Sequence, residues 1–287
     1  GMDLENVFLL RSLEDADGIR AAVEDAMYGV VVGASFIAME AAAALTGRDV
    51  EVTVVAPEST PFELSLGEEV GGAVQRLHEE KDVLFEMGRT VASFEGEGVV
   101  EDVVLDNDDR VEADLVVVGV GVEPVTDYLD GVKLNDDGSV PVDEHMRAAE
   151  NLYAAGDIAA FPDPRTGSAI RVEHWRLAMQ LGRVAAHNMA GKSAVYEGVP
   201  FFWTDQYHNM IRYVGHAEEW DELILDGDPA EGDFVAYYAR DGQVLAAAGM
   251  DRDRQMDAIA ELMRSGRMPG AERVRDGIDP AAMLRAE

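Results

Sequence analysis

Short apolar runs alternate with a helical pattern in the first third of the chain. A β-branched run over 29–33 precedes an alanine-rich helical segment over 36–45, and a second β-branched run follows over 50–55. Strand, helix and strand within about thirty residues predict a βαβ unit, whose strands are parallel. A helix over 68–80 and a short strand over 83–85 continue the alternation. The pattern therefore predicts an α/β domain with a parallel sheet.

The middle of the chain predicts an antiparallel meander that returns to this sheet. Three extended stretches, over 90–94, 99–105 and 111–118, are separated by polar turns. The last stretch ends in an apolar run over 115–118 that does not alternate. Such a run is typical of a central strand that is buried on both faces.

The last third of the chain has a different character. A short strand over 151–155 precedes a helix over 173–189, whose apolar side chains recur at helical spacing. Further strands are predicted over 211–214, 222–225, 234–239 and 243–248, with a helix over 251–265. Asp241-Gly242 is a hairpin signal between the last two strands. We place a domain boundary near 192–198.

Acidic side chains dominate the composition. The 287 residues include 57 Asp and Glu and 23 Lys and Arg, a formal net charge of −34. This charge repels nucleic acid and anionic membranes, which argues against both as partners. Lysine occurs only at Lys81, Lys133 and Lys192. Scarce lysine with an acidic surplus indicates adaptation to high salt (halophilic), and the alternative is a merely acidic cytosolic protein; both predict a cytoplasmic location.

Several kinds of chemistry are absent from the sequence. The chain has no cysteine, which excludes a disulfide scaffold, a thiol nucleophile and a Cys-ligated metal. The six histidines show no metal-ligand spacing, so we expect no metal site. No apolar run reaches the length of a membrane span. The length predicts two domains or three small ones.

The turn between the first strand and the first helix carries a variant of the dinucleotide fingerprint G-x-G-x-x-G/A. Gly33 occupies its first position, Ala38 its third, and Ser35 replaces the second glycine. A phosphate is favoured at such a turn by the free amides and dipole of the helix N-terminus. On this motif alone, a nucleotide site and a ligand-free βαβ turn are equally favoured.

In such a unit, an acidic residue at the carboxyl end of the second strand normally binds the ribose. Ala56 stands at that position, and Glu58 follows two residues later as the candidate. The segment 61–64 has no arginine for a 2′-phosphate, which favours NADH over NADPH. Gly119 and Gly121 end a strand at the same carboxyl edge, where open α/β sheets bind ligands; a simple β-turn is the alternative.

A second set of candidate residues follows the parallel sheet. Gly156 lets the backbone approach a ligand, and Asp157 can accept a hydrogen bond from a polyol hydroxyl. Large flat side chains that can line an aromatic cofactor stand over 173–175 and 202–203. Taken alone, a simple turn at 156–157 and an aromatic cluster in a domain core are the favoured explanations of these residues.

These motifs form an ordered set that covers nearly the whole chain. It comprises 13–16, 33–37 with 39–40, 118–122 with 124, 154–157, 173–175, 182–186 and 200–203. The set resembles the FAD-dependent pyridine nucleotide-disulfide oxidoreductases of the rubredoxin, putidaredoxin and ferredoxin reductase type. The G-A-S-F variant over 33–36 gives the nearest likeness to apoptosis-inducing-factor-like proteins.

The resemblance implies an α/β fold: a doubly wound Rossmann-like NAD(P) domain, a partial FAD domain and a C-terminal α+β interface domain. The NAD(P) domain would span 26–149 and the C-terminal domain 196–287. Residues 1–25 and 150–195 would be a remnant of the FAD-binding domain, whose N-terminal half-domain is missing from the chain. Ser35 and Ala56 depart from the family pattern.

The resemblance also implies residues for two cofactors, NADH and FAD. Those for the nicotinamide nucleotide are Gly33, Ala34, Ser35, Phe36, Ile37 and Glu40, with Gly119 and Gly121 beneath it. Those for the flavin are Gly156, Asp157, Glu173, His174 and Trp175, with Trp203 as its cover. Since the cofactors carry the chemistry, we expect no side chain to act as a catalytic acid or base.

The resulting expectation is a FAD-dependent NADH oxidoreductase of the ferredoxin or rubredoxin reductase type, truncated relative to its family. Its electron acceptor would be a small iron–sulfur protein or a quinone. The alternative is a non-catalytic nucleotide-binding or interaction module that retains the reductase fold. Such a module would dimerise through the flavin-domain surface that truncation uncovers.

Overall fold

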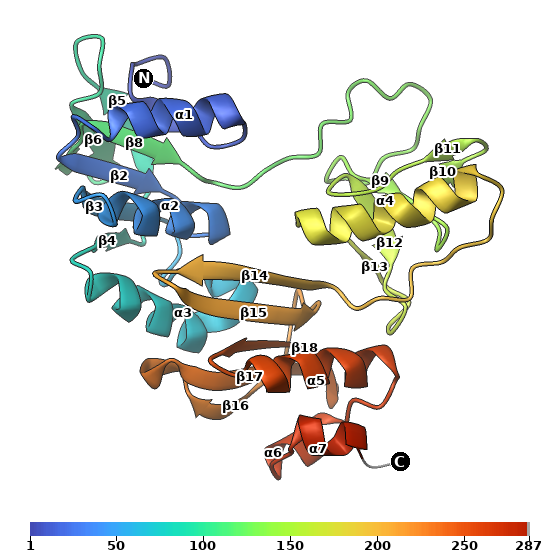
Figure 1. Cartoon of the computed structure of the whole chain (residues 1–287). Helices are drawn as coiled ribbons and strands as arrows, with labels where there is room; N and C mark the ends of the chain where they lie inside the picture. Colours follow the sequence, from blue (N-terminus) through green and yellow to red (C-terminus); the bar gives the residue numbers. More distant parts are fainter. Residues whose placement is uncertain (286–287) are drawn as a thin grey trace. The chain divides into compact units, whose positions relative to one another are not determined.

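The computed structural model describes residues 1–285 and divides into two compact units, the first of which consists of Gly1–Gly121, Thr204–Met210 and Pro229–Gly232. A parallel five-stranded sheet forms the centre of this first unit (Figure 1). Its strands lie in the order β1 (Val7–Leu9), β8 (Leu115–Val118), β2 (Tyr28–Val32), β3 (Glu51–Ala56) and β4 (Leu84–Met87). All neighbouring pairs are parallel, which confirms the predicted βαβ unit. The central valines of β2 and β8 are fully buried, which explains their unbroken apolar runs.

Three helices connect these strands: α1 (Leu13–Ala22), α2 (Phe36–Thr46) and α3 (Glu63–Glu79). The buried positions of α2 are mostly alanine, so this helix can lie close to β2 and β3. α3 begins at Glu63, but it is kinked at Gly67, whose backbone is not helical (φ 81°). The part of α3 after this kink corresponds to the helix predicted over 68–80.

Residues 1–25 contribute to the same parallel sheet. β1 pairs with β8, in the register Val7 to Val116, and α1 contacts both strands. The resemblance assigned this segment to a remnant of the FAD domain. Backbone hydrogen bonding instead makes it part of the first unit.

The predicted meander is confirmed as a separate antiparallel sheet of three strands. It consists of β5 (Val91–Glu95), β6 (Asp102–Leu105) and β7 (Arg110–Glu112). The stretch over 111–118 is divided at Asp114, whose carboxylate accepts hydrogen bonds from the amides of Met27 (2.8 Å) and Tyr28 (2.9 Å). The chain thereby leaves the meander and enters the parallel sheet as β8.

The second unit begins at Val122. Its first part contains a three-stranded sheet, a hairpin and one long helix. The elements are β9 (Val140–Pro141), β10 (Arg147–Ala149), β11 (Leu152–Tyr153), β12 (Ala159–Pro162), β13 (Ala169–Ile170) and α4 (Trp175–Met189). α4 buries Leu177 and Leu181 in a core with Phe161 and Tyr196. The strand predicted over 151–155 is shorter in the structure.

A five-stranded antiparallel sheet dominates the last third of the chain (Figure 1). Its strands lie in the order β14 (Phe201–Gln206), β15 (Asn209–Gly215), β18 (Gln243–Met250), β17 (Asp233–Arg240) and β16 (Glu222–Asp228). Asp241 and Gly242 have φ values of 52° and 77°, as a two-residue turn between β17 and β18 requires. The predicted hairpin is therefore confirmed.

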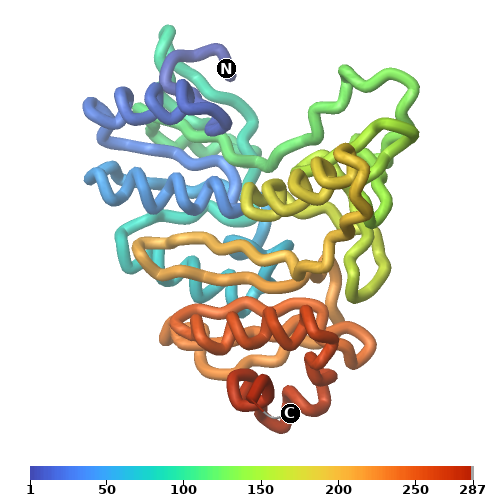
Figure 2. Tube along the Cα trace, turned by 45° about the vertical axis from the view of Figure 1, so that its right-hand side comes forward, coloured from blue at the N-terminus to red at the C-terminus, as the bar shows by residue number. Residues whose placement is uncertain are grey.

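Helices complete this last part. They are α5 (Asp253–Arg264), α6 (Ala271–Arg275) and α7 (Pro280–Arg285), with a short 3₁₀ turn at Pro229–Glu231. α5 runs along the sheet in both views and contacts β18 (Figures 1 and 2). The tip of the β14–β15 hairpin, Thr204–Met210, and the segment Pro229–Gly232 belong to the first unit.

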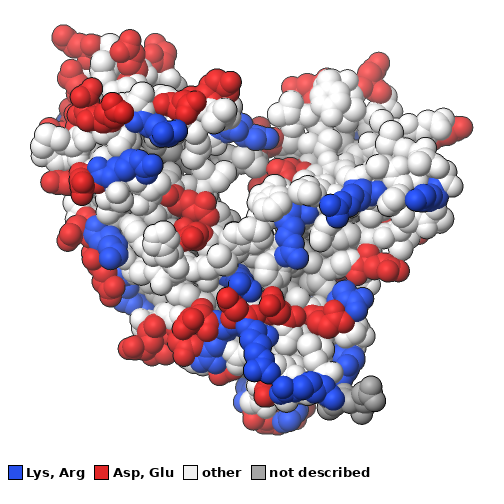
Figure 3. All heavy atoms as spheres, viewed as in Figure 1, with Lys and Arg blue, Asp and Glu red and all other residues white. Residues whose placement is uncertain are grey.

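The surface shown in Figure 3 carries acidic side chains over both units, with basic ones interspersed. Over residues 1–285, no helix combines the length and the apolarity needed to cross a bilayer.

Candidate functional site

The turn after β2 lies directly against the turn after β8. Gly33 has φ +107°, and a Cβ atom there would stand 2.4 Å from the carbonyl oxygen of Gly119. Gly119 in turn donates its amide to Val32 O at 2.8 Å. A side chain at residue 33 would thus separate the two strand ends. Glycine is required here for the close approach as well as for the backbone angle.

Gly119 also lies against the first turn of α2. A Cβ atom on Gly119 would come within 3.1 Å of the Ala38 Cβ atom and 3.2 Å of the Ala38 amide nitrogen. The small residue in the third fingerprint position therefore lets the helix and the β8 turn meet. Gly121 is exposed, with φ +103° and open space around its Cβ position.

Ser35 is the N-cap residue of α2, but its side chain does not cap the helix. Its hydroxyl donates to the carbonyl oxygen of Gly119 at 3.3 Å. The N-terminal amides of α2 are therefore not covered by this hydroxyl, and they retain the dipole that favours an anion. The Cβ atom of Ser35 nevertheless narrows the approach of a phosphate that a second glycine would leave open.

Neighbouring contacts hold the turn in place. The carbonyl oxygen of Ala34 accepts the amide of Phe62 at 2.9 Å, and the ring of Phe36 stacks on the ring of Phe62 at 4.8 Å. Ile37 is exposed on the surface of α2. The start of α3 thus fixes the shape of the β2–α2 turn.

Glu58 lies just beyond the end of β3, and its backbone carbonyl accepts the amide of Gly88 at 2.9 Å. Its side-chain oxygen Oε2 is buried and has no hydrogen-bond partner among residues 1–285. A buried carboxylate oxygen without a donor is unfavourable. Glu58 is thus a carboxylate two residues beyond Ala56, the position at the end of β3 where the fingerprint expects an acidic side chain.

Glu40 stands one turn after Phe36 on α2, so both side chains lie on one side of the helix. Its Oε1 atom accepts hydrogen bonds from the Thr204 hydroxyl at 2.6 Å and from the Asp205 amide at 3.2 Å. The β14–β15 hairpin tip therefore reaches the candidate nucleotide site. Thr204 and Asp205 are not identifiable from sequence, since they follow Glu40 by more than 160 residues.

The second set of candidate residues gathers in the second unit around the N-terminus of α4. Gly156 has φ +82°, and a Cβ atom there would stand 3.3 Å from the Ala178 Cβ atom. The positive φ and this tight contact both favour glycine at residue 156, where the turn lies against the first turn of the helix. Arg171 donates to the carbonyl oxygen of Asp157 at 3.3 Å and forms an ion pair with Glu173.

Aromatic side chains surround His174, the N-cap residue of α4. Its Nδ1 atom accepts the Arg176 amide at 3.2 Å. Its ring lies 5.6 Å from the Trp175 ring and 5.2 Å from the Trp203 ring. Burial, and next the positive charge of Arg176, lower the pKa of His174 and so favour its neutral imidazole. Trp175 is 59% exposed, which leaves a flat aromatic surface available.

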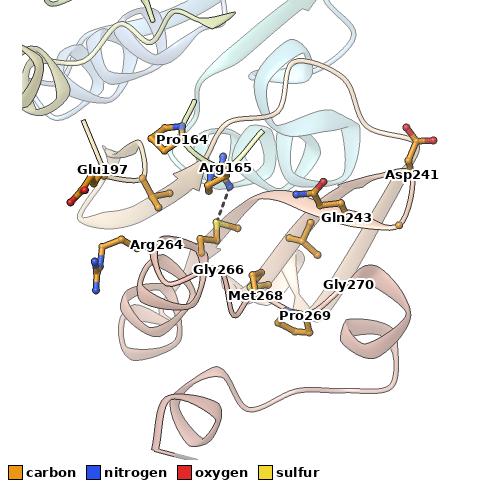
Figure 4. Close-up of a pocket in the computed structure, with 15 residues that line it drawn as sticks. Pro164, Arg165, Glu197, Asp241, Gln243, Arg264, Gly266, Met268, Pro269 and Gly270 are labelled. Carbon is orange, nitrogen blue, oxygen red and sulfur yellow. Dashed lines mark hydrogen bonds between the residues drawn. The ribbon is translucent and has the colours of Figure 1, made fainter. Parts of the chain in front are cut away.

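A separate hollow of about 550 Å³ lies in the second unit (Figure 4). Arg165 reaches into it, but its guanidinium already binds Asp163 at 2.7 Å and the carbonyl oxygen of Leu245 at 2.7 Å. None of the predicted site residues is among those that line this hollow. Within residues 1–285, no group of three or more His, Asp or Glu side chains is arranged to hold a metal ion.

Comparison with protein families gives two matches along the chain. Residues 1–182 match the model "Pyridine nucleotide-disulphide oxidoreductase", and residues 201–286 match "Reductase C-terminal". The first match alone covers more than half of the chain.

Individual proteins agree with this assignment. The chain is 39% identical to human "Apoptosis-inducing factor 3" over 272 residues, which cover 93% of this chain and 45% of that protein. It is 33% identical to the Burkholderia cepacia "Anthranilate 1,2-dioxygenase system ferredoxin--NAD(+) reductase component", covering 93% of this chain and 66% of that protein. The chain thus spans less than two thirds of the length of these relatives.

A solved structure shows the same fold. The reductase of the "covalent putidaredoxin reductase-putidaredoxin complex" superposes with a TM-score of 0.92 at 27% identity, covering 100% of this chain and 70% of that one. The expected Rossmann-like α/β fold with a C-terminal antiparallel domain is confirmed. The chain belongs to the pyridine nucleotide-disulphide oxidoreductase family, with the fold of its ferredoxin reductase members.

Proposed function

We propose that this chain acts in a FAD-dependent NADH oxidoreductase of the ferredoxin reductase type. The observation that carries the proposal is the β2–α2 turn. Gly33 and Gly119 bring two strand ends together beneath the N-terminus of α2, whose amides the Ser35 side chain does not cap. An anionic dinucleotide is the ligand that this geometry fits.

The candidate residues of the first unit would hold different parts of the nucleotide. The turn at Gly33, Ala34 and Ser35 would receive the pyrophosphate, with Gly119 and Gly121 beneath it. Glu58, just beyond the end of β3, would accept hydrogen bonds from the ribose hydroxyls through its carboxylate. A carboxylate in that place repels a 2′-phosphate, which favours NADH over NADPH.

Phe36, Ile37 and Glu40 lie along the following turn of α2. We propose that they face the nicotinamide half of the nucleotide. Phe36 and Ile37 would supply an apolar surface, and Glu40 would supply an acceptor for hydrogen bonds.

The second unit offers residues for the flavin. Gly156 and Asp157 would approach its polyol and phosphate region, where Asp157 can accept a hydroxyl hydrogen bond. Glu173, His174 and Trp175 would lie beside the ring, and Trp203 would cover it. When bound, the two cofactors supply hydride transfer and single-electron transfer. The protein orients them through these contacts and keeps His174 neutral.

The domain limits also remain a proposal. We assign 26–149 to the nicotinamide domain, 150–195 to the flavin domain and 196–287 to the C-terminal domain. Residues 1–25 go with the nicotinamide domain, because β1 pairs with β8. The names of two relatives, a ferredoxin–NAD(+) reductase component and a putidaredoxin complex, support a small iron–sulfur protein as the electron acceptor, with a quinone as the alternative.

The proposal is tested by adding FAD and then NADH to the purified chain. We expect a yellow complex that bleaches with NADH under anaerobic conditions and reduces an artificial acceptor. A chain that stays colourless and oxidises no NADH would reject catalysis by this chain alone.

The second candidate is a non-catalytic nucleotide-binding or interaction module that retains the reductase fold, binds a nucleotide weakly or not at all, and transfers no electrons. Ser35 in the second fingerprint position is the observation that favours it, because its Cβ atom narrows the phosphate approach. Melting temperatures with NADH, ADP and FAD separate the two. Stabilisation by NADH without stabilisation by FAD supports the module.

A further inference from the structure

A chain of five polar side chains crosses the first unit from α3 to α2 by way of the β14–β15 hairpin tip. Tyr207 lies 3.1 Å from Nδ1 of His78, and Nε2 of His78 lies 3.0 Å from Oε1 of Gln206. Nε2 of Gln206 donates to the Thr204 hydroxyl at 2.8 Å. Thr204 donates to Glu40 at 2.6 Å.

The hydrogen bonds of this chain can run in only one direction. An ionised carboxylate only accepts, so the Thr204 hydroxyl gives its proton to Glu40 and accepts from the Gln206 amide. The Gln206 carbonyl oxygen must then accept from Nε2–H of His78. The Nδ1 atom of His78 is left to accept from the Tyr207 hydroxyl. Every donor therefore points toward Glu40.

Burial makes this arrangement costly to disturb. His78 and Gln206 are 0% exposed and Thr204 is 1% exposed. A buried polar group that loses its partner keeps its full desolvation penalty. Desolvation also lowers the pKa of His78 to about 4, which leaves the imidazole neutral, with the single N–H that the chain requires.

Glu40, the last member of this series of hydrogen-bonded side chains, is exposed. Glu40 lies on the open surface of α2, where a free glutamate would sample several rotamers. The Thr204 hydroxyl and the Asp205 amide both bind its Oε1 atom. The Oε2 atom keeps its lone pairs for a donor on a bound nucleotide.

We propose that Thr204, Gln206 and His78 are positioning residues that fix the carboxylate of Glu40 at the nicotinamide half of the nucleotide site. The hairpin of the C-terminal region thereby becomes part of that site. The proposal rests on the proposed function, since it requires NADH at the β2–α2 turn.

The experiment measures binding of NADH and of ADP-ribose, which lacks the nicotinamide. Thr204→Val keeps the shape of the side chain but removes its hydroxyl, and Thr204→Ser restores a hydroxyl. We expect Thr204→Val to weaken the affinity for NADH about tenfold and to leave the affinity for ADP-ribose unchanged. Thr204→Ser should bind NADH almost as tightly as the original chain. In a Glu40→Ala background, Thr204→Val should have no further effect on NADH.

The other outcomes contradict the proposal in distinguishable ways. Equal losses for NADH and ADP-ribose in Thr204→Val, or no loss for either, would show a structural role only. If Thr204→Val weakens NADH binding as much in the Glu40→Ala background as in the original chain, Thr204 does not act through Glu40. If the original chain binds neither ligand, the proposed function fails and this inference fails with it.

Discussion

Glu58 combines a buried, unpartnered carboxylate oxygen with a place at the end of a parallel strand. The unpartnered oxygen disfavours the folded state, whereas the end of a parallel strand is where ligands bind in such sheets. Residues that serve binding commonly reduce stability in this way. A substitution at Glu58 therefore distinguishes a ligand-binding role from a structural role.

We predict that Glu58→Gln weakens NADH about tenfold, equivalent to about 1.4 kcal/mol, without lowering the free energy of unfolding. The neutral amide keeps the shape but accepts hydroxyl hydrogen bonds less strongly. Calorimetric titration and urea unfolding measure the two effects. Glu97→Gln, an exposed carboxylate in the turn after β5, is the matched control. An unchanged affinity in Glu58→Gln would remove this residue from the site.

His78 gives a prediction about pH. Desolvation lowers its pKa from 6.5 to about 4 in the folded chain, so the unfolded chain binds the proton first as the pH falls. The contribution of His78 to the free energy of unfolding is fully present above pH 6.5. It falls by roughly 2–3 kcal/mol as the pH is lowered to 4. His78→Gln should flatten the pH dependence of the unfolding free energy between these values. Parallel curves for the two chains would refute the assignment.

At the scale of elements, the sequence predicts the parallel sheet well because buried strands have an unmistakable apolar pattern. It does not predict α1, which has no fully buried side chain and hence a weak apolar period. It also does not predict β14, because the consecutive aromatic residues over 201–203 lack the apolar–polar alternation of a strand. The motif predicts Gly33 and Glu40, but not the partners of Glu40 on the hairpin tip, because tertiary structure alone brings them together.

α1 depends instead on its cap. The Ser12 hydroxyl accepts the Asp15 amide at 3.1 Å, and the Asp15 carboxylate accepts the Ser12 amide at 2.7 Å. We predict that Ser12→Ala lowers the free energy of unfolding by about 1 kcal/mol, measured by urea denaturation. Ser193→Ala, at an exposed position outside any helix or strand, should change it by much less. Equal effects in the two variants would show that the cap contributes nothing.

At the scale of the whole molecule, the net charge of −34 is the dominant property. Acidic side chains are spread over the face shown in Figure 3 rather than confined to one patch. Their mutual repulsion opposes folding, and salt screens it over a Debye length of about 3 Å at 1 M. This is the physical basis of the proposed adaptation to high salt.

We predict that the melting temperature rises by about 4–8 °C between 0.1 and 2 M KCl, which corresponds to about 2 kcal/mol. Thermal unfolding followed by circular dichroism measures it. Near the sequence pI of 4.3, where the net charge vanishes, the salt effect should shrink. A melting temperature that is independent of salt at pH 7 would favour an ordinary acidic protein.

A crystal structure of this chain with NADH would show directly where the nucleotide binds. We expect the pyrophosphate at the N-terminus of α2, beside Gly33 and Gly119, with a ribose hydroxyl donating to Glu58 and the nicotinamide half near Glu40. A nucleotide bound elsewhere in the chain would contradict this expectation. So would a β2–α2 turn that stays free of ligand at saturating NADH.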